Sequence, residues 1–168
     1  MNSVQIEENY AVKDSFLRER IAHGKRPGTR EFVALSEGVE AGLLIFEHFP
    51  STSLGFVYEI FVLEGFRGLG IGNLLLSKAE DVALESACTM LHLTARSLDQ
   101  EFIKDDDLKS WYLRKGFIHN FSDSGDMLKR LTGNVNTANQ LLRDITQIHE
   151  AHVEQRNSSQ ETPPLRMG

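Results

Sequence analysis

Three glycines in the segment Arg67-Gly68-Leu69-Gly70-Ile71-Gly72 form a turn that could bind an anion. The apolar run Phe56 to Leu63 before the turn is typical of a strand, and apolar residues at helical spacing follow it. Because glycine has no side chain, a ligand can approach the backbone closely, and the first amides of a helix have no partners within the helix. The helix dipole and the forked guanidinium of Arg67 would add to the attraction. The segment predicts a phosphate or pyrophosphate site, with a tight structural turn as the alternative.

The two common nucleotide-binding motifs fit this turn poorly. A dinucleotide-binding fingerprint requires a third glycine where the chain has Asn73. A P-loop requires a lysine followed by serine or threonine, whereas Asn73-Leu74-Leu75 follow the turn here. The anion is therefore expected to be neither NAD nor a nucleotide held by a P-loop.

Strands and helices are expected around this turn. Runs that are rich in Val, Leu, Ile and Phe, or that alternate between apolar and polar residues, predict strands over residues 31–35, 41–49, 56–63, 90–95, 117–121 and 127–131. Apolar residues at helical spacing predict helices over residues 11–22, 70–85 and 108–115. Glu37-Gly38 is expected to turn the first hairpin, and 97–107 to be a loop or partial helix. This order predicts an α/β fold in which helices cover the faces of a mixed sheet.

The C-terminal part of the chain has two different patterns. Apolar residues from 134 to about 155 fall on one stripe, which predicts an amphipathic helix that packs on its own domain or on a second copy of the chain. Residues 156–168 contain few large apolar groups and are expected to be a disordered tail. We therefore expect a domain over 1–132, an appended helix over 133–155 and a tail over 156–168.

Composition and charge limit the classes of partner. The formal net charge of −6 argues against nucleic-acid binding, which requires clustered lysine and arginine. An acidic surface could favour cationic acceptors such as amines, or could merely keep the protein soluble. The single cysteine, Cys88, can form no internal disulfide and has no second thiol with which to share a metal. With no recognisable signal peptide and no apolar run long enough to span a bilayer, a cytoplasmic protein is expected.

The glycine-rich segment resembles the acetyl-coenzyme A motif of the GNAT superfamily of N-acetyltransferases. The core of that motif is Arg or Gln, two residues, Gly, one residue, then Gly or Ala, and Arg67, Gly70 and Gly72 satisfy it. A second segment, from Trp111 to Phe117, is similar to the family's aromatic-Tyr and Gly-Phe element after the fifth strand. The resemblance covers about residues 30–131. It implies a GNAT-like mixed, mostly antiparallel sheet flanked by helices, with the C-terminal amphipathic helix as an addition.

The resemblance also implies a co-substrate, acetyl-CoA, and the residues that bind it. The pantetheine arm would pair with the backbone of the strand, at Phe61, Val62 and Leu63. The pyrophosphate would lie on the amides of the turn, with Arg67 beside it, at Gly68, Leu69, Gly70, Ile71 and Gly72.

Two catalytic residues follow from the same resemblance. Tyr112 would protonate the leaving thiolate as a general acid, or would simply pack among core aromatic residues. Glu59 is the candidate for the base that takes the proton of the amine, with an exposed strand glutamate as the ordinary alternative. His48 and His92 also lie near strand ends and could serve instead.

The chain departs from the family pattern near the expected acceptor site. Asp105 stands seven residues before Tyr112, where many members carry an asparagine. The loop over 97–107 is longer than usual, and one helix rather than two precedes the first hairpin. These departures imply an individual acceptor pocket, either more open or completed by a neighbouring subunit.

Together these features predict an enzyme that transfers an acetyl group from acetyl-CoA to a primary amine by direct attack. No covalent enzyme intermediate is expected, because the only thiol, Cys88, lies between the long helix and the next strand. The acceptor could be a small molecule or a peptide amine, and the protein could be a homodimer. Two other classes stay open: a non-catalytic acyl-CoA-binding module, and a protein-interaction module that uses the terminal helix and tail.

Overall fold

The computed structural model of the protein describes residues 3–120, 125–131 and 146–154. The chain divides into two units, Met1–Thr132 and Gly133–Gly168. In the second unit the described residues form a helix over 146–154, so a helix does follow the domain. The predicted tail over 156–168 and the rest of the predicted helix lie outside the described residues.

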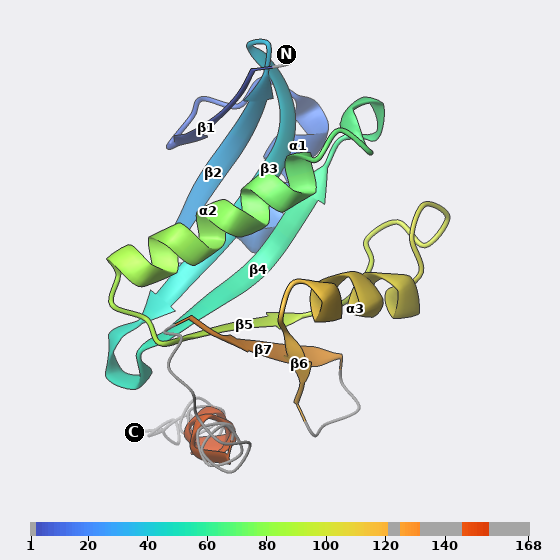
Figure 1. Ribbon diagram of the computed structural model, residues 1–168. Helices are drawn as coiled ribbons and strands as arrows, with labels where there is room; N and C mark the ends of the chain where they lie inside the picture. The colour runs from blue at the N-terminus through green and yellow to red at the C-terminus, as the bar shows by residue number, and fades with distance from the viewer. Residues whose placement is uncertain (1–2, 121–124, 132–145, 155–168) are drawn as a thin grey trace, which may run out of the picture. The chain divides into compact units, whose positions relative to one another are not determined.

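Within the described residues, seven strands form one sheet in the order β1-β2-β3-β4-β5-β7-β6 (Figure 1). The strands are β1 Val4–Glu8, β2 Thr29–Ser36, β3 Val39–Phe49, β4 Leu54–Val62, β5 Met90–Thr94, β6 Ile118–His119 and β7 Asp126–Arg130. Neighbouring strands are antiparallel, except that β4 and β5 run parallel. The predicted mixed, mostly antiparallel sheet is confirmed.

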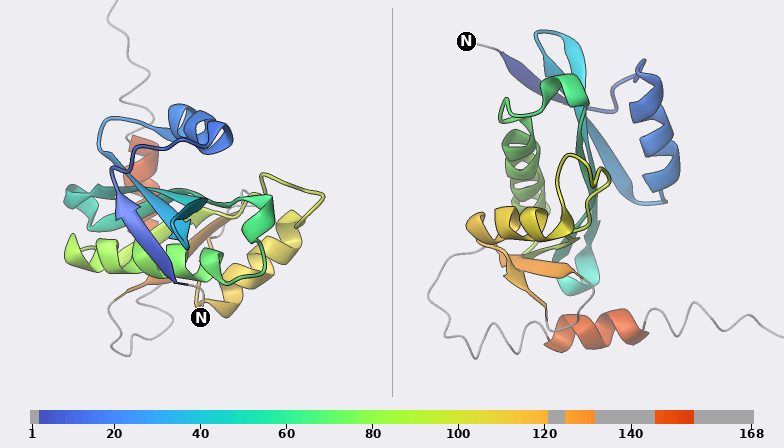
Figure 2. Two further views of the ribbon diagram at one scale, coloured as in Figure 1. Left: turned by 90° about the horizontal axis from the view of Figure 1, so that it is seen from above. Right: turned by 90° about the vertical axis from the view of Figure 1, so that its right-hand side faces the viewer.

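Helices cover both faces of this sheet. Helix α1 (Ser15–Gly24) lies on one face, and α2 (Ile71–Glu85) and α3 (Asp105–Arg114) lie on the opposite face (Figure 2). Each face has its own apolar core: α1 buries Leu17 against β2 and β3, whereas α2 buries one side of its length against the same strands from the other face. Because the central strands are buried on both faces, their apolar runs are continuous rather than alternating.

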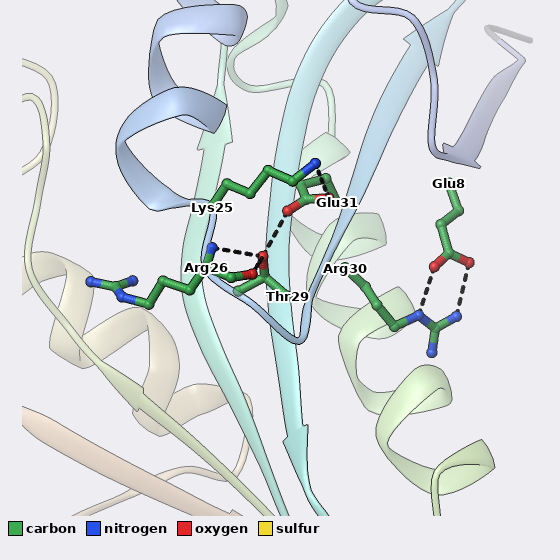
Figure 3. Close-up of polar contacts among 6 residues, drawn as sticks. All are labelled: Glu8, Lys25, Arg26, Thr29, Arg30 and Glu31. Atoms are coloured by element: carbon green, nitrogen blue, oxygen red, sulfur yellow. Dashed lines mark hydrogen bonds and ion pairs between the residues drawn. The ribbon is translucent and has the colours of Figure 1, made fainter. Parts of the chain in front are cut away.

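The edge strand β1 was not predicted from the sequence. Its five residues pair antiparallel with β2, and Val4 and Ile6 pack against the core on the α2 face. Arg30 of β2 fastens the end of β1 through two hydrogen bonds to the Glu8 carboxylate, of 2.7 and 2.9 Å (Figure 3). Only two of its side chains are apolar, so the strand has a short alternating pattern that is easily overlooked.

Helix α1 begins later than the sequence pattern suggested, at Ser15 instead of residue 11. Asp14 caps the helix, since its carboxylate accepts a hydrogen bond from Leu17 N at 2.9 Å. The buried Glu40 carboxylate of β3 accepts from the backbone N–H groups of Lys13 and Asp14, at 2.7 and 2.6 Å. Val12 lies in this extended segment and packs in the same apolar core as α1. For that reason its position fits the helical spacing, and the sequence pattern included it in the helix.

Helix α3 begins earlier than predicted, at Asp105 instead of residue 108. Three aspartates occupy its first turn, where the positive end of the helix dipole stabilises negative charge. The polar composition of this turn had suggested a loop. The closing hairpin is present, although β6 is shorter than the predicted strand over 117–121.

Strands β4 and β5 pair over only part of their length. The parallel ladder joins Leu54–Val57 to Met90–Leu93 and ends there. On its other edge β4 pairs with β3 throughout, but the register shifts at Tyr58, which makes a β-bulge. The two strands then diverge toward α3 (Figure 1). From Tyr58 to Val62, one edge of β4 therefore has no neighbouring strand within the described residues.

Candidate active site

A cavity of about 750 Å³ lies where β4 and β5 diverge. Its walls come from β4, the turn before α2, the loop after β5, α3 and one residue of α1. The lining residues are Arg20 and residues 57–62, 66–68, 70–73, 93–94, 96–99, 102–103, 108 and 111–112. The volume lies within the range of pockets that hold a cofactor or a drug-sized ligand.

The unpaired edge of β4 presents backbone groups to this cavity. Leu63 donates its N–H to the Ala41 carbonyl of β3 at 2.9 Å, and successive peptide groups of a strand point to opposite edges. The peptide groups of Ile60 and Val62 therefore point away from β3, toward the cavity. Of the three strand residues predicted to bind the cofactor, Val62 fits, whereas Phe61 and Leu63 direct their backbone to β3. Ile60 was missed because the phase of the strand is not visible in the sequence.

The first turn of α2 forms a second set of free donors. The first hydrogen bond of the helix runs from Leu74 N to Gly70 O at 3.2 Å, so the N–H groups of Ile71, Gly72 and Asn73 have no partner within the described residues. No side chain caps this end and its first turn has no acidic residue. Such a helix terminus, at the wall of a cavity, is well suited to a phosphate group.

The backbone conformation favours glycine at two positions of this turn but not at the third. Gly68 and Gly70 have φ angles of +77° and +82°, a left-handed conformation that other residues adopt only with strain. At Gly72 a Cβ atom would meet only Val62 Cγ2, at 3.9 Å, so a side chain could fit there. Leu69 is 54% exposed and does not line the cavity, so its side chain takes no part in the predicted site.

Arg67 lies in the wall of the cavity instead of standing free beside the turn. Its Nη1 donates to Asp99 Oδ2 at 2.7 Å, and its Nε donates to the Val62 carbonyl at 3.2 Å. The guanidinium also lies over the Phe102 ring, 4.3 Å from the ring centroid. The hydrogen bond from Arg67 holds the pKa of Asp99 below its ordinary value. The predicted contact of Arg67 with a pyrophosphate would therefore use the N–H groups that these two hydrogen bonds leave free.

Tyr112 lines the cavity from α3 and is 7% exposed. Its ring meets those of Trp111 and Phe117 edge-on, with centroids 4.8 and 5.4 Å away. Its hydroxyl has no hydrogen-bond partner within the described residues. Burial raises the pKa of Tyr112 above its ordinary value, so the phenol keeps its proton at neutral pH. Tyr112 is thus a core aromatic residue whose side chain also lines the cavity, so its packing role is present and its role as a general acid stays a prediction.

Glu59 lines the cavity from β4 and is buried, so the alternative of an exposed strand glutamate is wrong. Its two carboxylate oxygens accept hydrogen bonds from Arg20 of α1, from Nε at 2.6 Å and from Nη2 at 2.7 Å. The hydrogen bond to Glu59 raises the pKa of Arg20. Sequence reasoning missed Arg20, because nothing in the local pattern distinguishes it from other polar residues of an amphipathic helix.

The remaining candidates lie away from the cavity lining. His48 is the second-last residue of β3. His92 is buried beside Phe56, with its Nε2 3.7 Å from Asp126 Oδ1. Burial raises the pKa of the Cys88 thiol, which is consistent with a packing role.

Asp105 accepts hydrogen bonds from Ser97 N and Gln100 Nε2, both at 2.7 Å, and so shapes the loop that forms one wall of the cavity.

Comparisons with known proteins agree with this geometry. The family model described as "Acetyltransferase (GNAT) family" matches residues 2–103. No curated protein matches the chain.

Solved structures share the fold at low identity. A GNAT family acetyltransferase from Elizabethkingia anophelis, solved with acetyl-CoA bound, is 18% identical, with a TM-score of 0.55 over 76% of this chain and 98% of that one. An acetyltransferase of the GNAT family from Staphylococcus aureus Mu50 is 18% identical, with a TM-score of 0.53 over 77% and 100%. Tetrahymena GCN5 is 16% identical, with a TM-score of 0.52 over 71% and 79%. At this level of identity the likeness shows the fold.

The buried phenol of Tyr112 predicts a specific loss of stability at alkaline pH. Its pKa is raised in the folded chain, so its contribution is complete below the ordinary tyrosine pKa of about 10 and is lost as the pH rises toward the folded value. We expect the free energy of unfolding of Tyr112→Phe to fall less steeply than that of the wild type above pH ~10, by up to about 1.4 kcal/mol per pH unit. Urea unfolding at a series of pH values measures the slope. Phe117→Leu, which disturbs the same cluster without removing a titrating group, should keep the wild-type slope; equal slopes for wild type and Tyr112→Phe would contradict a buried phenol.

Proposed function

Because the chain belongs to the acetyltransferase (GNAT) family, we propose that it transfers an acetyl group from acetyl-CoA to a primary amine. One observation carries the proposal: a single cavity is lined by the free edge of β4, the uncapped first turn of α2 and the buried phenol of Tyr112. Each of these features matches a different part of acetyl-CoA, which is an elongated thioester.

The residues present fit the coenzyme in two places. Ile60 and Val62 would pair with the amide groups of the pantetheine arm, as a strand pairs with its neighbour. The N–H groups of Ile71, Gly72 and Asn73 would hold the diphosphate at the helix N-terminus. This set differs from the strand residues first expected, because the backbone of Phe61 and Leu63 already faces β3.

Acetyl-CoA supplies a thioester whose acetyl carbon the amine attacks directly. The new bond joins the amine nitrogen to that carbon, the carbon–sulfur bond breaks, and one amine proton must be removed while the sulfur gains a proton. Tyr112 would donate to the sulfur, since its phenol is neutral and its hydroxyl has no protein partner within the described residues. Glu59 would take the amine proton as the general base, because a carboxylate that receives two bonds from Arg20 retains further lone pairs that can accept it.

One observation favours a second candidate, a non-catalytic acyl-CoA-binding module. The Glu59 carboxylate is held by two hydrogen bonds from a guanidinium, and in this candidate it serves only to tie α1 to the sheet. Release of coenzyme A that depends on an added amine would exclude this alternative.

Location and metal content stay proposals of the same kind. No helix in the part of the chain that the structure describes is both long and apolar enough to cross a membrane. Among the described residues, no group of three or more His, Cys, Asp or Glu side chains could hold a metal ion. We propose a cytoplasmic location from the single, buried Cys88, which offers no disulfide.

The helix N-terminus provides a test of coenzyme binding that does not require the acceptor. An aspartate at residue 72 would repel a diphosphate but favour the helix dipole, so Gly72→Asp should weaken binding about ten- to a hundredfold while the melting temperature stays equal or rises. Calorimetric titration of coenzyme A and thermal unfolding measure the two effects. Gly72→Ala, which adds only the Cβ, should bind as the wild type does. Unchanged affinity in Gly72→Asp would place the diphosphate elsewhere.

The catalytic role of Tyr112 can be separated from its packing role. Tyr112→Phe keeps the ring among Trp111 and Phe117 and removes the proton donor, so kcat should fall by about 10²- to 10⁴-fold with little change in coenzyme affinity. The assay is thiol release from acetyl-CoA with the fastest amine of a panel of small amines, amino acids and lysine peptides. An unchanged kcat would mean that Tyr112 is only a core residue.

A further inference from the structure

A charged pair lines the cavity from the α1 face of the sheet. Arg20 of α1 and Glu59 of β4 meet through two hydrogen bonds, and their side chains are 26% and 8% exposed. Both residues line the cavity. The pair thus combines a buried carboxylate with a partly accessible guanidinium at one place.

Only one edge of the Arg20 guanidinium is used. Its Nε and Nη2 face Glu59, and no other hydrogen bond of this side chain occurs within the described residues. A guanidinium has five N–H donors, so both hydrogens of Nη1 and one of Nη2 are available. Nη1 and Nη2 together form the end of the fork, which matches the two oxygens of a carboxylate.

Arg20 and Glu59 together carry no net charge, and this limits which charged groups the acceptor can have. Glu59 can still accept a hydrogen bond from an amine, and Arg20 can still donate to an anion. An acceptor that carries both an amine and a carboxylate can bind to Glu59 and to Arg20. A polyamine would instead bring a second positive charge next to the Arg20 guanidinium. Because one guanidinium joins the two binding points, the amine and the carboxylate of the acceptor must lie close together.

Two other arginines line the cavity and could compete for an anion. Arg67 stands at the start of the glycine-rich turn and donates to Asp99 and to the Val62 carbonyl, so it does not share a contact with Glu59. Arg96 is exposed and lies in the loop after β5. Arg20 is the cavity arginine that directly contacts Glu59, the candidate amine-binding residue.

We propose that Arg20 determines the acceptor specificity, and that the acceptor is a small primary amine with an adjacent carboxylate, in the simplest case a free α-amino acid. This inference rests on the proposed acetyl transfer.

The test measures acceptor binding in the dead-end complex with coenzyme A, where no turnover is needed. The full chain, saturated with coenzyme A, is titrated calorimetrically with three matched trios: phenylalanine, leucine and lysine, each with its amide and its decarboxylated amine. At least one free amino acid should bind about tenfold or more tightly than its two analogues. If no free amino acid binds more tightly than its analogues, the proposal is overturned.

Variants then test whether Arg20 causes the preference for the free amino acid over its analogues. Arg20→Lys keeps a cation for Glu59 but has no fork, so the preference for the free amino acid should be lost. Arg18→Gln, on the exposed side of the same helix, and Arg96→Gln should retain it. Retention in Arg20→Lys, or loss in Arg96→Gln, would overturn the assignment.

The wild-type trios decide the acceptor class even if Arg20→Lys does not fold. Failure of the proposed function has a different signature, because the wild type would then either not bind coenzyme A or bind it without releasing coenzyme A from acetyl-CoA when any amine of the panel is added. That result would overturn both proposals and leave the ion pair as a structural link between α1 and β4.

Discussion

Beyond Val57, one edge of β4 has backbone N–H and C=O groups that make no hydrogen bonds to β5. The rest of the site depends on which groups provide the missing hydrogen bonds. A buried N–H or C=O without a partner is costly, so a strand edge inside a cavity is stable only if water or a ligand can reach it. The bulge at Tyr58 and the departure of β5 after Thr94 create this edge. Arg67 already donates to one of its carbonyls, at Val62, where an amide of a bound ligand would donate instead.

The cavity is lined by apolar and by charged side chains, and the charges are largely compensated in pairs. Arg20 with Glu59 ties α1 to β4, and Arg67 with Asp99 ties the glycine-rich turn to the loop after β5. The pairs therefore stabilise the walls in addition to providing ligand contacts. The N-terminus of α2 provides most of the attraction for a phosphate, because its first-turn amides have no acidic residue beside them. Under the proposed function, the diphosphate of the coenzyme and the amine would thus bind at different parts of one cavity.

Local patterns predicted the elements whose cause is local. The glycine-rich turn, the hairpin at Glu37-Gly38 and the long helix after Gly70 all follow from backbone conformation or from periodicity within a few residues. The hairpin turn has left-handed φ angles at both central residues, as a two-residue connection requires. By contrast, β1 has a brief pattern and depends on pairing with β2, some 25 residues away.

The site was predicted in part for the same reason. Tyr112 and Glu59 line one cavity as expected, because a motif and a strand alternation identify them. Arg20 was not foreseen, since its pairing with Glu59 joins residues 39 positions apart. The choice between Phe61 and Val62 depends on which edge of β4 faces β3, and the engagement of Arg67 by Asp99 depends on the path of a loop. None of these is encoded in local sequence.

The central claim, that the free edge of β4 pairs with the coenzyme, is tested most directly by backbone amide hydrogen exchange. NMR would follow individual amides of the full chain with and without coenzyme A. The account predicts that exchange slows at least about tenfold at Ile60 and Val62 when coenzyme A is added, whereas Phe61 and Leu63, which already donate to β3, stay slow in both states. If coenzyme A binds while Ile60 and Val62 exchange as fast as before, the coenzyme lies elsewhere and the account is contradicted.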